Sequence, residues 1–183
     1  MIEITIEAKL FNYLNKFSSN EQTRYNLNGI RFARNGDIVA TDGHKLGLMH
    51  NGFKVVQWQD DAAQGFTCIT HYKDKGVERT IKNMSGILTI NLEGDFITMT
   101  DEKGSSIKLD WCDQYPEYMR VIPEATDLTE SNTVAFNPKY MYDFAGWEKG
   151  EHIKIEIHGD DVPMLVYNSR LTDFIGVLMP CRP

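Results

Sequence analysis

Residues 2–17, IEITIEAKLFNYLNKF, change their hydrophobic period halfway along, and this change decides the fold. Ile2, Ile4 and Ile6 alternate with polar residues, which is typical of a half-buried strand. After them the apolar residues recur at helical spacing, with polar side chains on the opposite side. The stretch therefore predicts a strand that leads directly into an amphipathic helix.

The same order recurs twice along the chain. Three strand-like runs follow the first helix, and Asn35-Gly36 between two of them is a strong signal for a two-residue hairpin turn. In the third round, Asn137 is placed to cap a helix and Pro138 to occupy its first position. The predicted strands are 2–6, 27–34, 37–41, 45–50, 65–71, 87–92, 95–100, 105–111, 133–136, 152–158, 163–167 and 174–179, and the predicted helices are 7–17, 73–84 and 138–147.

Three rounds of strand, helix and three strands, each about fifty to sixty residues long, indicate an internal repeat in an α+β protein. One face of each unit's sheet and helix is apolar, so the units must pack side by side. The segment 112–131 contains two prolines and little periodicity. We therefore expect a two-unit domain over 1–115, a linker over 116–131 and a one-unit half domain over 132–183.

The composition describes an ordinary globular protein without a membrane anchor. The 183 residues are 42% hydrophobic, and they contain neither an apolar run of membrane-spanning length nor an apolar segment typical of a signal peptide. The three cysteines are far apart and odd in number, which favours a reducing cytoplasm over a disulfide framework. The formal net charge of −7 argues against a protein that coats DNA, unless cations gather on one face.

The helices carry such cations, whereas the acidic residues concentrate at turns and connectors. On the second predicted helix, three cations lie on the face opposite the apolar stripe. Solvation of an ordinary helix face is the plain alternative interpretation. If the three helices share one surface, the candidate DNA-facing residues are Lys9, Lys16, Lys75, Arg79, Lys82 and Lys139.

Catalytic and metal-binding interpretations find little support. Asp42 and His44 have no evident third partner, and a structural role is favoured for both. His152 and His158 would lie roughly 20 Å apart on one strand, too far for a single metal. Cys68 and His71 form a single Cys-x-x-His motif, and the sequence offers no second pair of metal ligands to accompany it. We therefore expect no enzyme, no cofactor and no metal.

Three motifs, in order, resemble those of the bacterial beta sliding clamp of replicative DNA polymerase. The first is Thr23 to Ile30 with Val39 to Leu46, TRYNLNGI and VATDGHKL. The second is Tyr115 to Pro123, YPEYMRVIP, and the third is Val177 to Pro183, VLMPCRP. The resemblance covers the chain from end to end: residues 1–123 are similar to the middle domain, and 132–183 to the second half of the last domain.

The resemblance implies the sliding-clamp fold, with helices lining the channel of a ring and antiparallel sheets outside. It also implies that the cations on the helices face double-stranded DNA. A pocket between the domains would bind short peptides of polymerases, the clamp loader and repair proteins, through an apolar trough with a cationic rim. Carried over position by position, the pocket residues are Thr41, Gly43, His44, Lys45, Leu46, Pro116, Arg120, Val121, Val177, Leu178, Met179, Pro180 and Arg182.

The chain departs from the family pattern in residues and in size. Lys45 and Met119 stand where the family usually has arginine, and Cys181 and Pro183 replace apolar residues, which puts partner preference in doubt. Three units are present instead of six, so a ring of twelve would need four chains. Such an abbreviated plan would suit a virus or mobile element. The alternative function is a clamp-derived adaptor or decoy that binds clamp-interacting peptides or the host clamp without encircling DNA.

Overall fold

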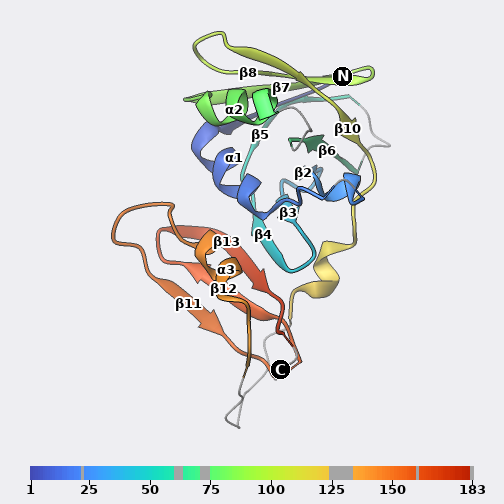
Figure 1. Ribbon diagram of the computed structural model, residues 1–183. Helices are drawn as coiled ribbons and strands as arrows, with labels where there is room; N and C mark the ends of the chain where they lie inside the picture. Colours follow the sequence, from blue (N-terminus) through green and yellow to red (C-terminus); the bar gives the residue numbers. More distant parts are fainter. Residues whose placement is uncertain (22, 60–63, 71–74, 124–133, 160, 182–183) are drawn as a thin grey trace.

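The computed structural model describes residues 1–21, 23–59, 64–70, 75–123, 134–159 and 161–181. It contains two antiparallel sheets and short helices, which confirms the predicted α+β class (Figure 1). The five-stranded sheet has the order β5-β1-β7-β8-β9, and the eight-stranded sheet has the order β10-β6-β2-β3-β4-β13-β12-β11. No helix in the described part of the chain is both long enough and apolar enough to cross a lipid bilayer.

The first unit begins with the strand and helix that the change of period predicts. A 3-10 turn, η1, extends the helix by one turn. The predicted hairpin forms at Asn35-Gly36, but its loop spans residues 34–36 rather than two residues, because the Ala33 amide donates to the Asp37 carbonyl oxygen and Gly36 has a φ of +95°. The elements are β1 Ile2–Glu7, α1 Ala8–Leu14, η1 Asn15–Phe17, η2 Tyr25–Leu27, β2 Gly29–Ala33, β3 Ile38–Thr41, β4 Lys45–Met49 and β5 Lys54–Trp58.

The second unit repeats this order. Its elements are β6 Gly65–Ile69, α2 Lys75–Asn83, β7 Ile87–Glu93, β8 Phe96–Thr100, β9 Ser106–Leu109 and β10 Trp111–Cys112. The start of the predicted helix 73–84 lies outside the described residues. In both units one more strand, β5 or β10, follows the three consecutive strands. The sequence pattern missed β5, and its predicted strand 105–111 joined β9 to the first residue of β10. Val55 and Val56 on β5 are half exposed, so they do not alternate as residues of a half-buried strand do.

The third unit follows a linker that contains η3, Tyr118–Val121, and of which residues 124–133 lie outside the described part. Asn137 caps the helix as predicted, because its side chain accepts a hydrogen bond from the Lys139 amide. The predicted helix 138–147 is too long, since it ends in a 3-10 turn before Ala145. The elements are α3 Pro138–Met141, η4 Tyr142–Phe144, β11 Ile153–Glu156, β12 Met164–Asn168 and β13 Leu171–Leu178. Residue 133 of the predicted strand 133–136 lies outside the described part, and its described residues form a bridge between Ala135 and Cys181.

The first two units complete each other by exchanging their leading strands. In the five-stranded sheet, β1 of the first unit pairs with β7 of the second. In the eight-stranded sheet, β6 of the second unit pairs with β2 of the first. Each leading strand also pairs with the trailing strand of its own unit, as β1 does with β5 and β6 with β10. The repeat is thus strand, helix, three strands and a trailing strand.

The third unit continues the eight-stranded sheet through β13, which pairs with β4 of the first unit. Gly47 lies opposite Gly176 at the centre of this pairing. Phe17 packs over Gly47 and Phe144 packs over Gly176, because neither glycine has a Cβ to occupy that space. The two phenylalanine rings lie 5.0 Å apart at an interplanar angle of 61°. The same aromatic-on-glycine contact, made once by each unit, joins the third unit to the first.

Candidate functional site

The outer face of the eight-stranded sheet carries an apolar cluster separate from the main core. Five buried side chains form it, from β3, β4, β12 and β13: Val39, Leu46, Leu48, Leu165 and Val177. Tyr118 and Ile122 of the linker, and Tyr115 just before it, pack against this cluster. The linker therefore crosses the junction of the first and third units on the side opposite the main core.

The register of β4 and β13 decides which side chains face this junction. Leu46 lies opposite Val177, and both point to the outer face. Leu178, the next residue along β13, points to the opposite face and is fully buried in the main core. Beyond the strand, the Met179 amide donates to the His44 carbonyl oxygen at 3.0 Å. This hydrogen bond holds Met179 beside the turn that precedes β4.

That turn, residues 41–45, is built by its own side chains. The Asp42 carboxylate accepts from the amides of His44 and Lys45, at 2.9 and 3.0 Å. The Thr41 hydroxyl donates to the Lys45 carbonyl oxygen at 2.7 Å, and Gly43 has a φ of +90°. The Arg24 guanidinium donates to the Asp42 carbonyl oxygen at 2.7 Å. The Thr-Asp-Gly-His motif thus shapes a turn, consistent with the structural role favoured for Asp42.

A hydrogen bond from Tyr118 holds the linker against the sheet. The Tyr118 hydroxyl donates to the Asp37 carboxylate at 2.9 Å, and Asp37 also contacts His50 Nδ1 at 2.7 Å and receives the Asn35 amide at 2.8 Å. Burial, reinforced by the hydrogen bond to Asp37, raises the pKa of Tyr118 to about 12. The phenol therefore remains a donor at neutral pH and keeps η3, with Val121, beside the junction.

A cavity of about 150 Å³ opens between the turn, the linker and β13; we call it the junction pocket. Eight of the thirteen predicted pocket residues line it: Thr41, Gly43, Lys45, Leu46, Pro116, Val121, Val177 and Met179. Leu27, Glu117 and Tyr118 line it as well and were not predicted. All three lie within the segments that carry the sequence motifs, so including every residue of those motifs would have found them.

Four of the other predicted residues, all within the described part of the chain, do not line the junction pocket. The His44 ring stacks on Tyr140 of α3, with centroids 5.3 Å apart. Arg120 is exposed on η3, Pro180 is half-buried after β13, and Leu178 lies in the main core. Arg182 falls outside the described residues.

The predicted cationic rim is wrong for Lys45. Its side chain is 6% exposed, and its ammonium donates to the Lys16 carbonyl oxygen at 2.6 Å and to the Asp143 carboxylate. The Asp42 carboxylate also lies near this ammonium, 3.9 Å from the nitrogen. Only the aliphatic part of the Lys45 side chain can contribute to the junction pocket, because its ammonium is neutralised by Asp143 of η4. A guest in the pocket would meet apolar contact there rather than an ammonium.

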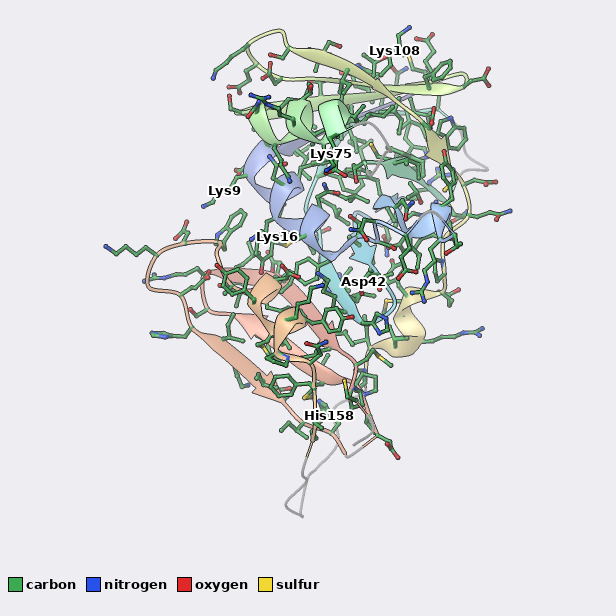
Figure 2. All side chains as sticks on the ribbon, in the orientation of Figure 1. Lys9, Lys16, Asp42, Lys75, Lys108 and His158 are labelled. Carbon is green, nitrogen blue, oxygen red and sulfur yellow. The ribbon has the colours of Figure 1, made fainter. Side chains whose placement is uncertain are left out.

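The six predicted DNA-facing cations are all exposed; five lie on the three helices, and Lys16 lies on η1, which extends α1. Figure 1 shows α2, α1 and α3 following one another along the molecule, and Figure 2 labels Lys9, Lys16 and Lys75 along the first two. Lys9 and Lys16 also reach the third unit. The Lys9 ammonium lies 4.1 Å from the centroid of the Trp147 ring and 3.4 Å from the Glu148 carboxylate, and Lys16 lies 3.4 Å from the Ala145 carbonyl oxygen.

Several solved bacterial sliding clamps have a similar structure. The DNA polymerase III subunit beta from Pseudomonas aeruginosa matches with a TM-score of 0.74 at 19% identity, over 100% of this chain and 67% of that one. The beta subunit from Thermotoga maritima matches with 0.73 at 16%, over 100% and 66%. A sliding clamp from Bartonella birtlesii bound to griselimycin matches with 0.70 at 21%, over 100% and 66%.

No family model and no curated protein matches the sequence. The chain spans about two thirds of the length of the solved clamps it matches. Because the identities are low and the TM-scores high, the likeness is one of architecture. The chain has the sliding-clamp fold in a shortened form, as its three motifs indicated.

Proposed function

We propose that this chain is a non-catalytic sliding clamp that encircles duplex DNA in the cytoplasm and holds short peptides of DNA polymerases and clamp loaders. The junction pocket is the observation that carries the proposal. Three segments far apart in the sequence, around residues 41–46, 116–121 and 177–179, meet in one apolar cavity with a floor of Leu46 and Val177. Such a cavity suits the apolar anchors of a short peptide.

The cations on the helices support the DNA-binding part of the proposal. Lys75, Arg79 and Lys82 are exposed on α2, and the structure gives α1 and α3 exposed lysines too. Contacts of this kind neutralise phosphates without reading bases, which is what a protein that slides along DNA requires. A ring of twelve units would contain four of these chains, so its native mass would be four times 21.0 kDa.

The test of encirclement is retention on closed DNA. We expect the protein to co-elute with nicked circular plasmid at low salt and to leave it when the plasmid is linearised. Replacing Lys75, Arg79 and Lys82 together with glutamate should lower retention by about tenfold or more, because three phosphate contacts become repulsive. Gel filtration of a labelled chain on the two forms of the plasmid measures both effects.

The matched control reverses three exposed cations that lie off the helices: Lys54, Lys103 and Arg170. It changes the net charge by the same amount, and retention should stay within about twofold of the unmodified chain. Equal loss in both variants would reduce the DNA contact to a net-charge effect. If the unmodified chain is not retained on the circle, encirclement is refuted. A chain that still binds clamp-interacting peptides would then be the adaptor or decoy.

The junction pocket is tested separately with Met179→Glu. A carboxylate at this position would have to be desolvated by a bound peptide, so affinity should fall by about tenfold or more, equivalent to about 1.4 kcal/mol. Fluorescence anisotropy with a labelled clamp-binding peptide of a bacterial replicative polymerase measures it. Met119→Glu is the control, because Met119 is 52% exposed on η3 and does not line the pocket. Equal affinity in both variants would remove the assignment.

A further inference from the structure

The third unit has the same internal pairing as the first two. In each unit the leading segment pairs with the segment that follows the three strands: β1 with β5, β6 with β10, and Ala135 with Cys181. Within the described residues, this pairing in the third unit is one bridge, in which the Cys181 amide donates to the Ala135 carbonyl oxygen at 2.7 Å. The described part of the third unit therefore follows the same plan as the other two units.

The third unit differs in lacking the exchange that completes the other two. The leading strand of each of the first two units pairs with the first strand of the other unit's triple, β1 with β7 and β6 with β2. In the third unit, the first strand of the triple is β11. Among the described residues, β11 pairs only with β12, and Ala135 pairs only with Cys181. Within this described part, both edges that an exchange would use are thus unpaired.

Apolar side chains at these edges are exposed where their counterparts are buried. On β2, Ile30 and Phe32 have no exposed surface, and on β7 the same is true of Leu88 and Ile90. On β11, Ile155 is 38% exposed although it lies opposite the fully buried Val166 and so faces the core side of the sheet.

Neighbouring residues of the third unit add to this exposed apolar surface. Phe136, beside the bridge, is 36% exposed, and Tyr142 on η4 is 82% exposed. Lys154 and Glu156 of β11 alternate with Ile155, so they point to the other face of the sheet, where they pair with each other. The core-facing side of β11 therefore has no charge of its own to oppose burial.

We propose that a second copy of this chain covers these edges, so that two third units form one composite domain about a two-fold axis. The residue-134–136 segment of each copy would add to β11 of the other, as β1 adds to β7 and β6 to β2 within one chain. Such an interface is isologous, because each copy supplies one leading segment and receives one. The composite domain would help to close the proposed ring, and its biological purpose rests on that proposal. The interface itself is formed by residues of the third unit alone.

The composite domain predicts which positions of two chains lie together. In a Cys112→Ser/Cys181→Ser background, one chain carries Ala135→Cys and another carries Ile155→Cys. Cys68 is fully buried and its burial raises the pKa of the thiol, so it should not react. After mixing and subunit exchange, a short bis-maleimide should join the two chains into a covalent species of twice 21.0 kDa on a denaturing gel.

The control pairs the Ile155→Cys chain with a Val56→Cys chain, because Val56 is 59% exposed on the outer strand β5. This mixture should give at least tenfold less cross-linked dimer. As a second measurement, Ile155→Lys should raise the dissociation constant of the dimer by about tenfold or more in sedimentation velocity, whereas Val56→Lys should not change it. Ile155 is already partly exposed, so its replacement leaves the fold of the monomer in place.

A strictly monomeric chain at micromolar concentration, or equal cross-linking in both mixtures, would overturn the composite domain. The outcome is separable from that of the proposed function. Specific cross-linking without retention on circular DNA would keep the composite domain and remove the clamp. Retention on circular DNA without cross-linking would keep the clamp and require that its ring close in another way.

Discussion

Replacing Lys45 with methionine is expected to lower the free energy of unfolding by about 3 kcal/mol. Methionine fills similar space but removes the ammonium that three acceptors surround, namely the Lys16 carbonyl oxygen and the carboxylates of Asp143 and Asp42. The side chain of Lys45 is 6% exposed, so water cannot replace it fully. Asp143 is 28% exposed, which keeps the cost at the lower end for a broken buried pair. Urea denaturation measures the change.

Lys16→Met is the matched control for this substitution. Lys16 reaches the third unit from η1, but its side chain is exposed and its nearest acceptor, the Ala145 carbonyl oxygen, is 3.4 Å away. Its loss should change the free energy of unfolding by no more than about 0.5 kcal/mol. In a double-mutant cycle, Lys45→Met and Asp143→Leu should couple by at least about 1 kcal/mol. Equal effects of the two lysine substitutions would show that the Lys45 ion pair contributes nothing special.

A methyl group on Gly176 is expected to destabilise the protein by about 2 to 3 kcal/mol. A Cβ at this position would lie 2.6 Å from Cδ1 of Phe144 and 3.0 Å from the Val166 carbonyl oxygen. Phe144 cannot retreat, because it is fully buried and packs against Phe17 and Phe174. The cost of Gly176→Ala should appear as a lower urea midpoint without a change in the slope of the transition.

Shrinking the opposing ring provides the control for Gly176→Ala. Phe144→Leu alone removes buried contacts and should also destabilise the protein. Combined with Gly176→Ala, the smaller side chain leaves room for the new methyl group. The double variant should therefore be more stable than the sum of the single effects predicts, by about 1 kcal/mol or more. Strict additivity would place the cause of the Gly176→Ala effect elsewhere than in the contact with Phe144.

Local signals in the sequence were sufficient for much of the secondary structure. The alternation over residues 2–6, the hairpin at Asn35-Gly36 and the Asn137-Pro138 cap all depend on neighbours in the chain, and each was predicted at the right place, although the hairpin loop is longer than the two residues expected. The trailing strand β5 was missed because its valines are half exposed. The exchange of leading strands was missed too, since pairings such as β1 with β7 join residues 80 to 90 positions apart, where periodicity carries no information.

In the candidate site, too, the features that depend on local sequence were predicted, and those that depend on distant contacts were not. The motifs identified most of the junction pocket, because the pocket is built from whole segments that the turn at 41–45 and the linker hold in place. The role of Lys45 could not be predicted in the same way. Its ammonium turns away from the pocket toward Asp143, which lies 98 positions along the chain. A sequence motif records that a cation stands at this position, but it does not record which acceptor neutralises it.

The pairing of β4 with β13 has a consequence for how the pocket would receive a guest. Leu46 and Val177 come from different units but are neighbours in one hydrogen-bonded sheet, so the floor of the pocket cannot open or slide without breaking main-chain bonds. The floor of the pocket is therefore formed before any peptide would bind, so little conformational entropy would be lost there on binding. Selectivity among peptides should then arise from differences in their dissociation rates rather than from conformational changes of the protein.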